Sequence, residues 1–173
     1  MTEITHIVVM GVAGSGKTTV ARLLAERLGR PYAEADEFHP PENIAKMSAG
    51  EPLTDDDRWP WLRAIREWLT VRTLAGESAV VTCSALKVTY RDLLREADGR
   101  IRFLHLAAQG PLLEDRMEHR AGHFMPMSLL ASQLATLEPL TADEDGVTLS
   151  VEDPPGAIAD RAMSAFGLTR QES

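Results

Sequence analysis

Apolar residues along the chain form two kinds of pattern, short runs typical of buried strands and longer segments with helical spacing. The first run is THIVVM at 5–10, and TTVARLLAERL at 18–28 then places apolar residues every three or four positions before Gly29. Short runs rich in β-branched residues are typical of parallel sheets, because helices cover both faces of such strands. The chain therefore begins as strand, loop and helix.

The same alternation continues along the rest of the chain. Pro41 suits the first turn of a helix, and the aspartates at 55–57 precede another helix whose positive dipole end they complement. We expect an α/β fold in which helices flank a five-stranded parallel sheet. The further strands are expected at 31–35, 78–83, 101–106 and 147–151, and the further helices at 42–48, 59–74, 87–97, 111–119, 129–137 and 155–166.

One segment, RAGHFMPMS at 120–128, interrupts the alternation. It places Gly122 and Pro126 between two expected helices and carries the basic side chains of Arg120 and His123. Glycine and proline between periodic segments are typical of a surface loop. We expect this segment to form a small lid.

Composition limits the class of protein. With 173 residues, of which 44% are hydrophobic, the chain suits a single domain over 1–173. No window approaches the roughly 18 apolar residues that span a bilayer, and the beginning of the chain lacks the pattern of a signal peptide. The lone Cys83 excludes an intramolecular disulfide and suits a small buried apolar side chain. We expect a soluble, cytoplasmic protein without a membrane partner.

The charge balance limits the partners further. The formal net charge of −8 argues against a general nucleic-acid surface. Any anionic ligand must then be held by local backbone amides and a few well-placed cations. No nucleic-acid partner is expected.

A phosphate-binding motif lies between the first strand and the first helix. GVAGSGKT at 11–18 matches G-x-x-x-x-G-K-[ST] in full, which a glycine-rich turn that merely precedes a helix would rarely do. The pattern predicts ATP bound through Lys17, which reaches the β- and γ-phosphates, and Mg²⁺ bound through the Thr18 hydroxyl. The residues expected to cradle the phosphates with their backbone amides are Gly11, Val12, Ala13, Gly14, Ser15 and Gly16.

The motif fixes the phosphate donor but not the reaction, because switches, motors and small-molecule kinases share it. The chain has no room for a large effector domain and no N-K-x-D guanine-reading motif, which favours a compact kinase. Cys83 and Ser84 end the third strand, where P-loop proteins commonly carry a magnesium-associated aspartate. The metal is therefore expected to depend on Thr18, phosphates and water, with Ser84 or Asp36 acting through water.

The acceptor is expected at the carboxyl ends of the strands. Asp36, in EADEFHPPENI, follows the second strand, where its carboxylate could orient a substrate hydroxyl or take its proton. The alternative is that Asp36 or His39 caps the helix that begins near Pro41. Position alone does not separate the two roles.

Several cations could serve an acidic substrate or the transferred phosphoryl group. Arg58 follows the three aspartates, and Lys87 and Arg91 are four residues apart on one expected helix face, although surface or dipole-compensating roles would explain each. Arginines on a closing lid stabilise the charge that develops during phosphoryl transfer, a role that fits Arg120. Arg116 is equally explained by neighbours on its own helix.

Four blocks of the sequence resemble the gluconokinases of the small P-loop type. They are GVAGSGKT, DEFHPPENIAKMSAGEPLTDDDRWPWL at 36–62, CSALKVTYRDLLR at 83–95 and RAGHFM at 120–125. The resemblance implies a nucleoside monophosphate kinase-like fold with a lid, a possible homodimer, and ATP-dependent phosphorylation of D-gluconate to 6-phospho-D-gluconate. Glu34-Ala35 departs from the family, which commonly has a small or acidic residue followed by glycine there.

The resemblance also assigns roles to individual positions. It implies that Asp36 is the hydroxyl-orienting base and that Arg120 and His123 belong to the lid, with Lys17, Asp36 and Arg120 as catalytic residues. The candidates that it implies for the substrate pocket are Asp36, His39, Arg58, Lys87, Arg91 and His123.

Two alternatives remain open. Shikimate kinases share the phosphate loop and the aspartate after the second strand, but would be expected to carry a glycine-rich run where this chain has Ser84-Ala85-Leu86-Lys87. A regulatory module that binds ATP without chemistry would show no acceptor-dependent turnover.

Overall fold

The computed structural model describes residues 3–12, 14–107 and 127–170 of the chain. Its five strands form one sheet in the order β2-β3-β1-β4-β5, and every neighbouring pair is parallel. This confirms the sheet that the apolar runs predict. The strands are β1 (Thr5–Met10), β2 (Tyr32–Glu34), β3 (Val80–Thr82), β4 (Arg100–Ala107) and β5 (Gly146–Ser150).

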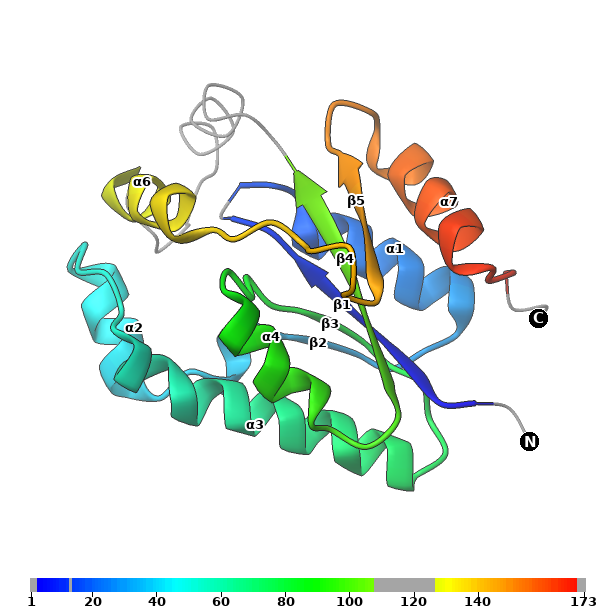
Figure 1. The fold of residues 1–173 in the computed structure, drawn as a ribbon, viewed down its shortest axis with the longest axis horizontal. Coiled ribbons are helices and arrows are strands. Elements are labelled where there is room, and N and C mark those ends of the chain that lie inside the picture. The colour runs from blue at the N-terminus through cyan, green and yellow to red at the C-terminus, as the bar shows by residue number, and fades with distance from the viewer. Residues whose placement is uncertain (1–2, 13, 108–126, 171–173) are drawn as a thin grey trace.

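Helices cover both faces of the sheet (Figure 1). On one face α1 (Lys17–Leu28) and α7 (Pro155–Phe166) pack on Ile7 and Val9, and on the other α3 (Asp55–Leu74) and α4 (Val88–Arg95) pack on Val8 and Met10. Successive residues of β1 thus enter opposite cores, as the period of two in a strand requires.

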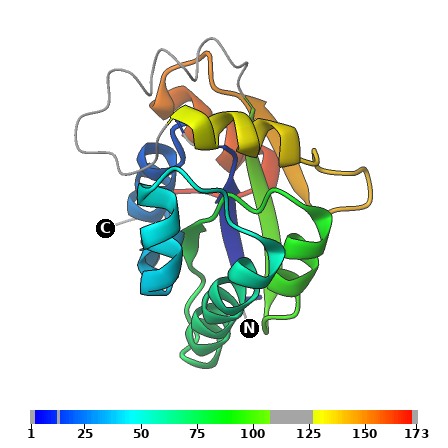
Figure 2. The same ribbon diagram turned by 90° about the vertical axis from the view of Figure 1, so that its left-hand side faces the viewer.

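Two more helices lie beyond the carboxyl ends of β1 and β4. They are α2 (Pro41–Ser48) and α6 (Met127–Thr136), at the left of Figure 1 and facing the viewer in Figure 2. None of the helices in the described parts of the chain is long and apolar enough to cross a membrane. The end of the sheet that α2 and α6 flank is also the end at which the phosphate loop lies.

Two local structures differ from the sequence prediction. Helix α3 begins at Asp55 rather than at residue 59, because Thr54 forms a capping box with Asp57: Asp57 N donates to Thr54 Oγ1 (3.2 Å) and Thr54 N to Asp57 Oδ2 (2.9 Å). The aspartates therefore form the first turn instead of preceding it. A short 3-10 helix, η1 (Ala35–Phe38), follows β2 and was not expected.

Part of the sequence prediction lies outside the described residues. This applies to the expected helix at 111–119, to the expected lid up to residue 126, and to the positions of Ala13, Arg116, Arg120 and His123. Residues 127 and 128 of the expected lid form the start of α6.

Candidate active site

The phosphate loop connects β1 to α1 through glycines with positive φ. A Cβ at Gly11 (φ +149°) would lie 2.8 Å from the carbonyl oxygen of Leu106 and 2.8 Å from Ser15 Oγ, so a side chain does not fit. Gly16 (φ +93°) is the N-cap of α1 and offers no capping side chain. The first amides of α1 therefore remain available to an anion, whose charge the helix dipole favours.

The Lys17 side chain folds back over this loop. Its Nζ donates to the carbonyl oxygens of Gly11 (2.9 Å) and Val12 (3.1 Å). These two hydrogen bonds hold the Lys17 ammonium group against the loop. Phosphate oxygens of a bound nucleotide would contact the same ammonium group. Thr18 follows in the first turn of α1 and is partly exposed.

The turn that carries Asp36 is anchored on both sides. Ala35 N donates to Thr82 Oγ1 at the end of β3 (3.3 Å), and Trp61 Nε1 of α3 donates to the Ala35 carbonyl oxygen (2.8 Å). Asp36 itself is exposed, and the N-cap position of α2 falls to Pro40, so neither Asp36 nor His39 occupies it. The structure thus fixes the backbone of Asp36 at the carboxyl end of the sheet, as predicted, although within η1.

The pKa of the Cys83 thiol reflects the charged groups around the end of β3. Burial raises the pKa of its thiol to about 12, and the charges of Lys17 and Asp36 act on the thiol in opposite directions. Lys17 and Asp36 therefore both lie within electrostatic reach of the residue that follows β3. The thiol is protonated at neutral pH and packs in the core, as its sequence context predicts.

His39 is held in one orientation by two neighbours. Its ring stacks on Trp61 with centroids 4.2 Å apart, and its Nδ1 lies 3.1 Å from Nδ2 of the buried Asn43. The same Asn43 Nδ2 donates to the carbonyl oxygen of Asp57 (2.8 Å), which fixes this atom as the amide nitrogen. Because an amide nitrogen only donates, His39 Nδ1 accepts and the ring proton lies on Nε2.

The His39 ring is neutral at physiological pH. Burial, and then the nearby charge of Arg58, lowers the pKa of His39 from 6.5 to about 4. His39 therefore contributes a hydrogen-bond donor at Nε2 and no positive charge.

The two cations Arg58 and Lys87 come together around Asp55. Lys87 Nζ donates to the Asp55 carboxylate (3.2 and 3.4 Å), and Arg58 Nη1 lies 3.7 Å from Asp55 Oδ1. Tyr90 completes the group, since its hydroxyl accepts from Arg58 Nη1 (2.8 Å) and donates to Asp55. The hydrogen bond from Tyr90, reinforced by Lys87, holds the pKa of Asp55 below its ordinary value. We call Asp55, Arg58, Lys87 and Tyr90 the cation cluster.

Sequence reasoning missed Asp55 and Tyr90. A signal was present in the spacing: Asp55 and Arg58 are three residues apart in one helix, and Tyr90 is three residues after Lys87. Tyrosine attracts little attention in a sequence because most tyrosines on a helix pack in a core, and Tyr90 does so as well.

Arg91 does not face the cation cluster, which corrects its assignment to the substrate pocket. Its side chain is 0% exposed and pairs with Glu144 through Nε (2.6 Å) and Nη2 (3.0 Å). The remaining donors reach the carbonyl oxygens of Ala85 (2.7 Å) and Pro139 (3.3 Å). The physical reason is a tertiary partner: the carboxylate of Glu144, 53 residues away in the sequence, holds the guanidinium group in the protein interior.

Arg91 instead holds together two segments behind the cation cluster. Ala85 has a positive φ (+46°), and the hydrogen bond from Arg91 fixes its carbonyl group in the loop that leads to Lys87. Burial by itself would raise the pKa of Glu144, but hydrogen bonds led by that of Arg91 outweigh it and lower the pKa to about 2. The pair is therefore ionised and acts as a support for the loop.

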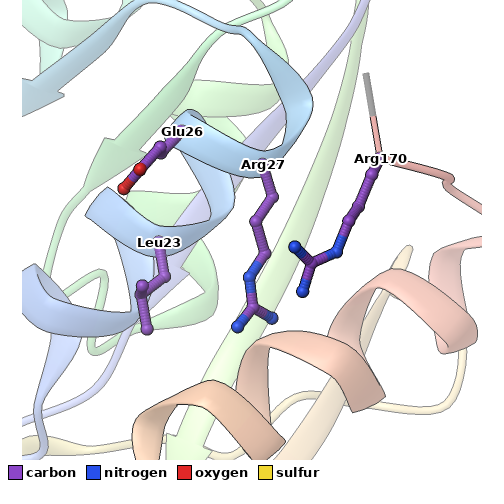
Figure 3. Close-up of a pocket in the computed structure, with 4 residues that line it drawn as sticks. All are labelled: Leu23, Glu26, Arg27 and Arg170. Atoms are coloured by element: carbon purple, nitrogen blue, oxygen red, sulfur yellow. The ribbon is translucent and has the colours of Figure 1, made fainter. Parts of the chain in front are cut away.

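A separate hollow of about 260 Å³ lies at the other end of α1 (Figure 3). Its two cations share one carboxylate, because Arg27 donates to Asp160 (2.7 Å) and Arg170 lies 3.9 Å from the same group. Arg27 is in the last turn of α1, whereas the phosphate loop precedes the first. We assign no role in the site to this hollow.

Comparison with known proteins identifies the family. A family model described as shikimate kinase matches residues 13–135. A gluconokinase of Gluconobacter oxydans (strain 621H) is 51% identical over 160 residues, covering 92% of this chain and 90% of that protein. The crystal structure of a gluconokinase from Sinorhizobium meliloti 1021 superimposes with a TM-score of 0.86 at 49% identity, covering 96% of this chain and 94% of the other.

A second solved structure agrees with these matches. A sugar kinase from Janibacter sp. HTCC2649 has a TM-score of 0.90 and 54% identity, over 95% of each chain. The chain therefore belongs to the gluconokinases, P-loop kinases of the shikimate kinase type.

Proposed function

We propose that this protein catalyses the ATP-dependent phosphorylation of D-gluconate to 6-phospho-D-gluconate. The observation that carries the proposal is the combination, at one end of the sheet, of the phosphate loop, the Asp36 turn and the cation cluster. A linear sugar acid needs a cation for its carboxylate and hydrogen-bonding groups for its hydroxyls. The cation cluster supplies the positive charge for the carboxylate, and His39 and Asp36 supply the hydrogen-bonding groups for the hydroxyls.

For the nucleotide, the amides of the phosphate loop and the ammonium group of Lys17 bind the phosphates. The donors at the site suit Mg²⁺, which prefers oxygen ligands and retains water: the Thr18 hydroxyl would hold the ion, with Ser84 or Asp36 acting through water. When bound, Mg²⁺ neutralises charge on the β- and γ-phosphates. Among the described residues no group of three or more acidic, histidine or cysteine side chains could hold a metal ion.

For the acceptor, Asp36 accepts a hydrogen bond from the terminal hydroxyl and takes its proton as the oxygen attacks the γ-phosphorus, while the bond from the γ-phosphorus to the β-phosphate oxygen breaks and ADP leaves. His39 donates from Nε2 to another hydroxyl of the substrate. Arg58 and Lys87 bind the carboxylate. Arg120 and His123 act from the lid, with Arg120 stabilising the charge on the transferred group.

A homodimer and a cytoplasmic location are also part of the proposal. The dimer is supported by the family resemblance, and sedimentation velocity at several protein concentrations tests it. The location is supported by the cysteine content, since a single cysteine fits a reducing compartment.

The test is a coupled ADP-release assay with D-gluconate, shikimate, nucleoside monophosphates and dephospho-coenzyme A as acceptors. Gluconate should raise ADP release far above the blank. Shikimate is the main alternative acceptor, because the family model that matches this chain is described as shikimate kinase. The loop at 84–87 argues against it, since it lacks the glycine-rich run expected of a shikimate kinase. A protein that bound ATP without responding to any acceptor would be a regulatory module.

A further inference from the structure

The cation cluster contains a carboxylate of its own. Asp55 receives hydrogen bonds from Lys87 and Tyr90 and lies 3.7 Å from Arg58, yet its side chain remains 44% exposed. Arg58 and Lys87 are 13% and 31% exposed. The groups expected to bind an acidic substrate are therefore already partly neutralised by the protein.

The charges of the cluster sum to a single positive charge. Arg58 and Lys87 contribute two positive charges and Asp55 one negative charge. This sum covers the cluster alone. Among its neighbours His39 is neutral, Arg91 is paired with Glu144 and Asp57 is paired with Lys46 (2.8 Å), whereas Asp56 and Glu138, which accepts from Val88 N (2.9 Å), are further acids outside the cluster. One carboxylate of a ligand thus completes the neutralisation.

The cluster still has donors to offer while Asp55 stays in place. The contacts of Arg58 with described residues use Nη1, which leaves Nε and Nη2 for a ligand. The hydrogen bonds of Lys87 to described residues both go to the one Asp55 carboxylate. A ligand carboxylate can therefore bind beside Asp55 rather than in its place.

A phosphate group bound in the cation cluster would carry more negative charge beside Asp55 than a carboxylate does. Arginine and lysine bind phosphate as readily as carboxylate, so the two cations alone do not discriminate. Phosphate monoesters carry about −1.5 to −2 charges at pH 7 and are repelled by a neighbouring aspartate. A site can reject a wrong ligand through such a like-charge contact.

We propose that Asp55 is a specificity-determining residue that makes this subsite select a carboxylate over a phosphate group. The inference rests on the proposed function, because it assumes that the cation cluster binds the acid group of the acceptor. It adds the prediction that the acceptor pocket binds phosphorylated polyols of similar length more weakly than gluconate.

The test compares binding of D-gluconate and D-glucitol 1-phosphate, which carries a phosphate ester at the end where gluconate has its carboxylate. Calorimetry on the full chain saturated with a non-hydrolysable ATP analogue and Mg²⁺ gives both Kd values without turnover. In Asp55→Asn, the preference for gluconate over the phosphate ester should fall at least about tenfold relative to wild type. Asp56→Asn, an exposed neighbour in the same helical turn, should leave the preference unchanged.

The outcomes separate the possible failures. If Asp55→Asn weakens both ligands by the same factor, Asp55 only holds the two cations in place and the inference is overturned. An Asp55→Ser variant repeats the test in case the asparagine forms new hydrogen bonds. If wild-type protein does not bind gluconate, the proposed function fails, and the inference with it.

Discussion

The buried pair of Arg91 and Glu144 gives a prediction whose size follows from the structure. The change is Glu144→Gln, which keeps the shape of the side chain and removes its charge. Glu144 is 4% exposed and Arg91 is 0% exposed, so the guanidinium group would remain buried without a counter-charge. Removing one partner of a buried ion pair typically costs about 3–5 kcal/mol.

The depressed pKa of Glu144 gives a second value for the same interaction. The difference between its ordinary value of 4.5 and about 2, at about 1.36 kcal/mol per pKa unit, corresponds to about 3 kcal/mol of folding free energy. The free energy derived from the pKa thus agrees with the lower end of the range expected for a buried ion pair. For a chain of this length each kcal/mol lowers Tm by about 2–4 °C, so we expect a decrease of about 6–20 °C.

The assay is urea unfolding at pH 7, with thermal unfolding as a second measurement. Glu152→Gln, an exposed change of the same chemistry, is the control and should stay within about 0.5 kcal/mol of wild type. The advantage of wild type over Glu144→Gln should also depend on pH. Because the folded pKa of Glu144 is depressed, this advantage is complete above about pH 4.5 and declines as the pH falls toward 2. A loss below about 1 kcal/mol, or one independent of pH between 7 and 3, would refute the reasoning.

Three further predictions concern the proposed reaction. Asp36→Asn should keep ATP binding but lower kcat at least about a hundredfold, because general-base assistance contributes that much; stopped-flow ADP release measures it. Lys87→Met should raise the KM for gluconate about 10- to 150-fold with little effect on the KM for ATP, since a hydrogen bond to a charged group is worth about 1.5–3 kcal/mol. Arg120→Ala should lower kcat more than ATP affinity, as steady-state kinetics and nucleotide titration would show.

Each of these has a result that contradicts it. Near-normal turnover in Asp36→Asn, matching a Glu37→Gln control on the same turn, would leave Asp36 without a catalytic role. An increase in the KM for ATP alone would remove Lys87 from the acceptor pocket. For Arg120→Ala, weaker ATP binding with normal kcat would make the residue a ground-state nucleotide contact.

Sequence patterns predicted the strands and the phosphate loop because both depend on local spacing. The five parallel strands lie where the apolar runs place them, and Gly11 to Thr18 connects β1 to α1. The same patterns could not predict η1, since the hydrogen bonds that anchor it come from Thr82 and Trp61, distant in sequence.

The misassignment of Arg91 has a specific cause. The side chain of Arg91 is 0% exposed and follows an ion pair rather than the helix face that its spacing from Lys87 suggested. The partner of Arg91, Glu144, is 53 residues away in a loop before β5, and no local pattern connects them. The direction in which a long side chain points, and the residue with which it pairs, thus depend on tertiary packing. The sequence showed which residues lie near the site but not these pairings.

The central claim is that the cation cluster and Asp36 present gluconate to the γ-phosphate of ATP. Phosphorus NMR of a reaction of purified protein with ATP, Mg²⁺ and D-gluconate tests it most directly. We predict a new phosphate monoester on the terminal carbon of gluconate, formed in equal amount to ADP. ADP formed without this ester, or no more ADP than in the reaction without gluconate, would contradict the account.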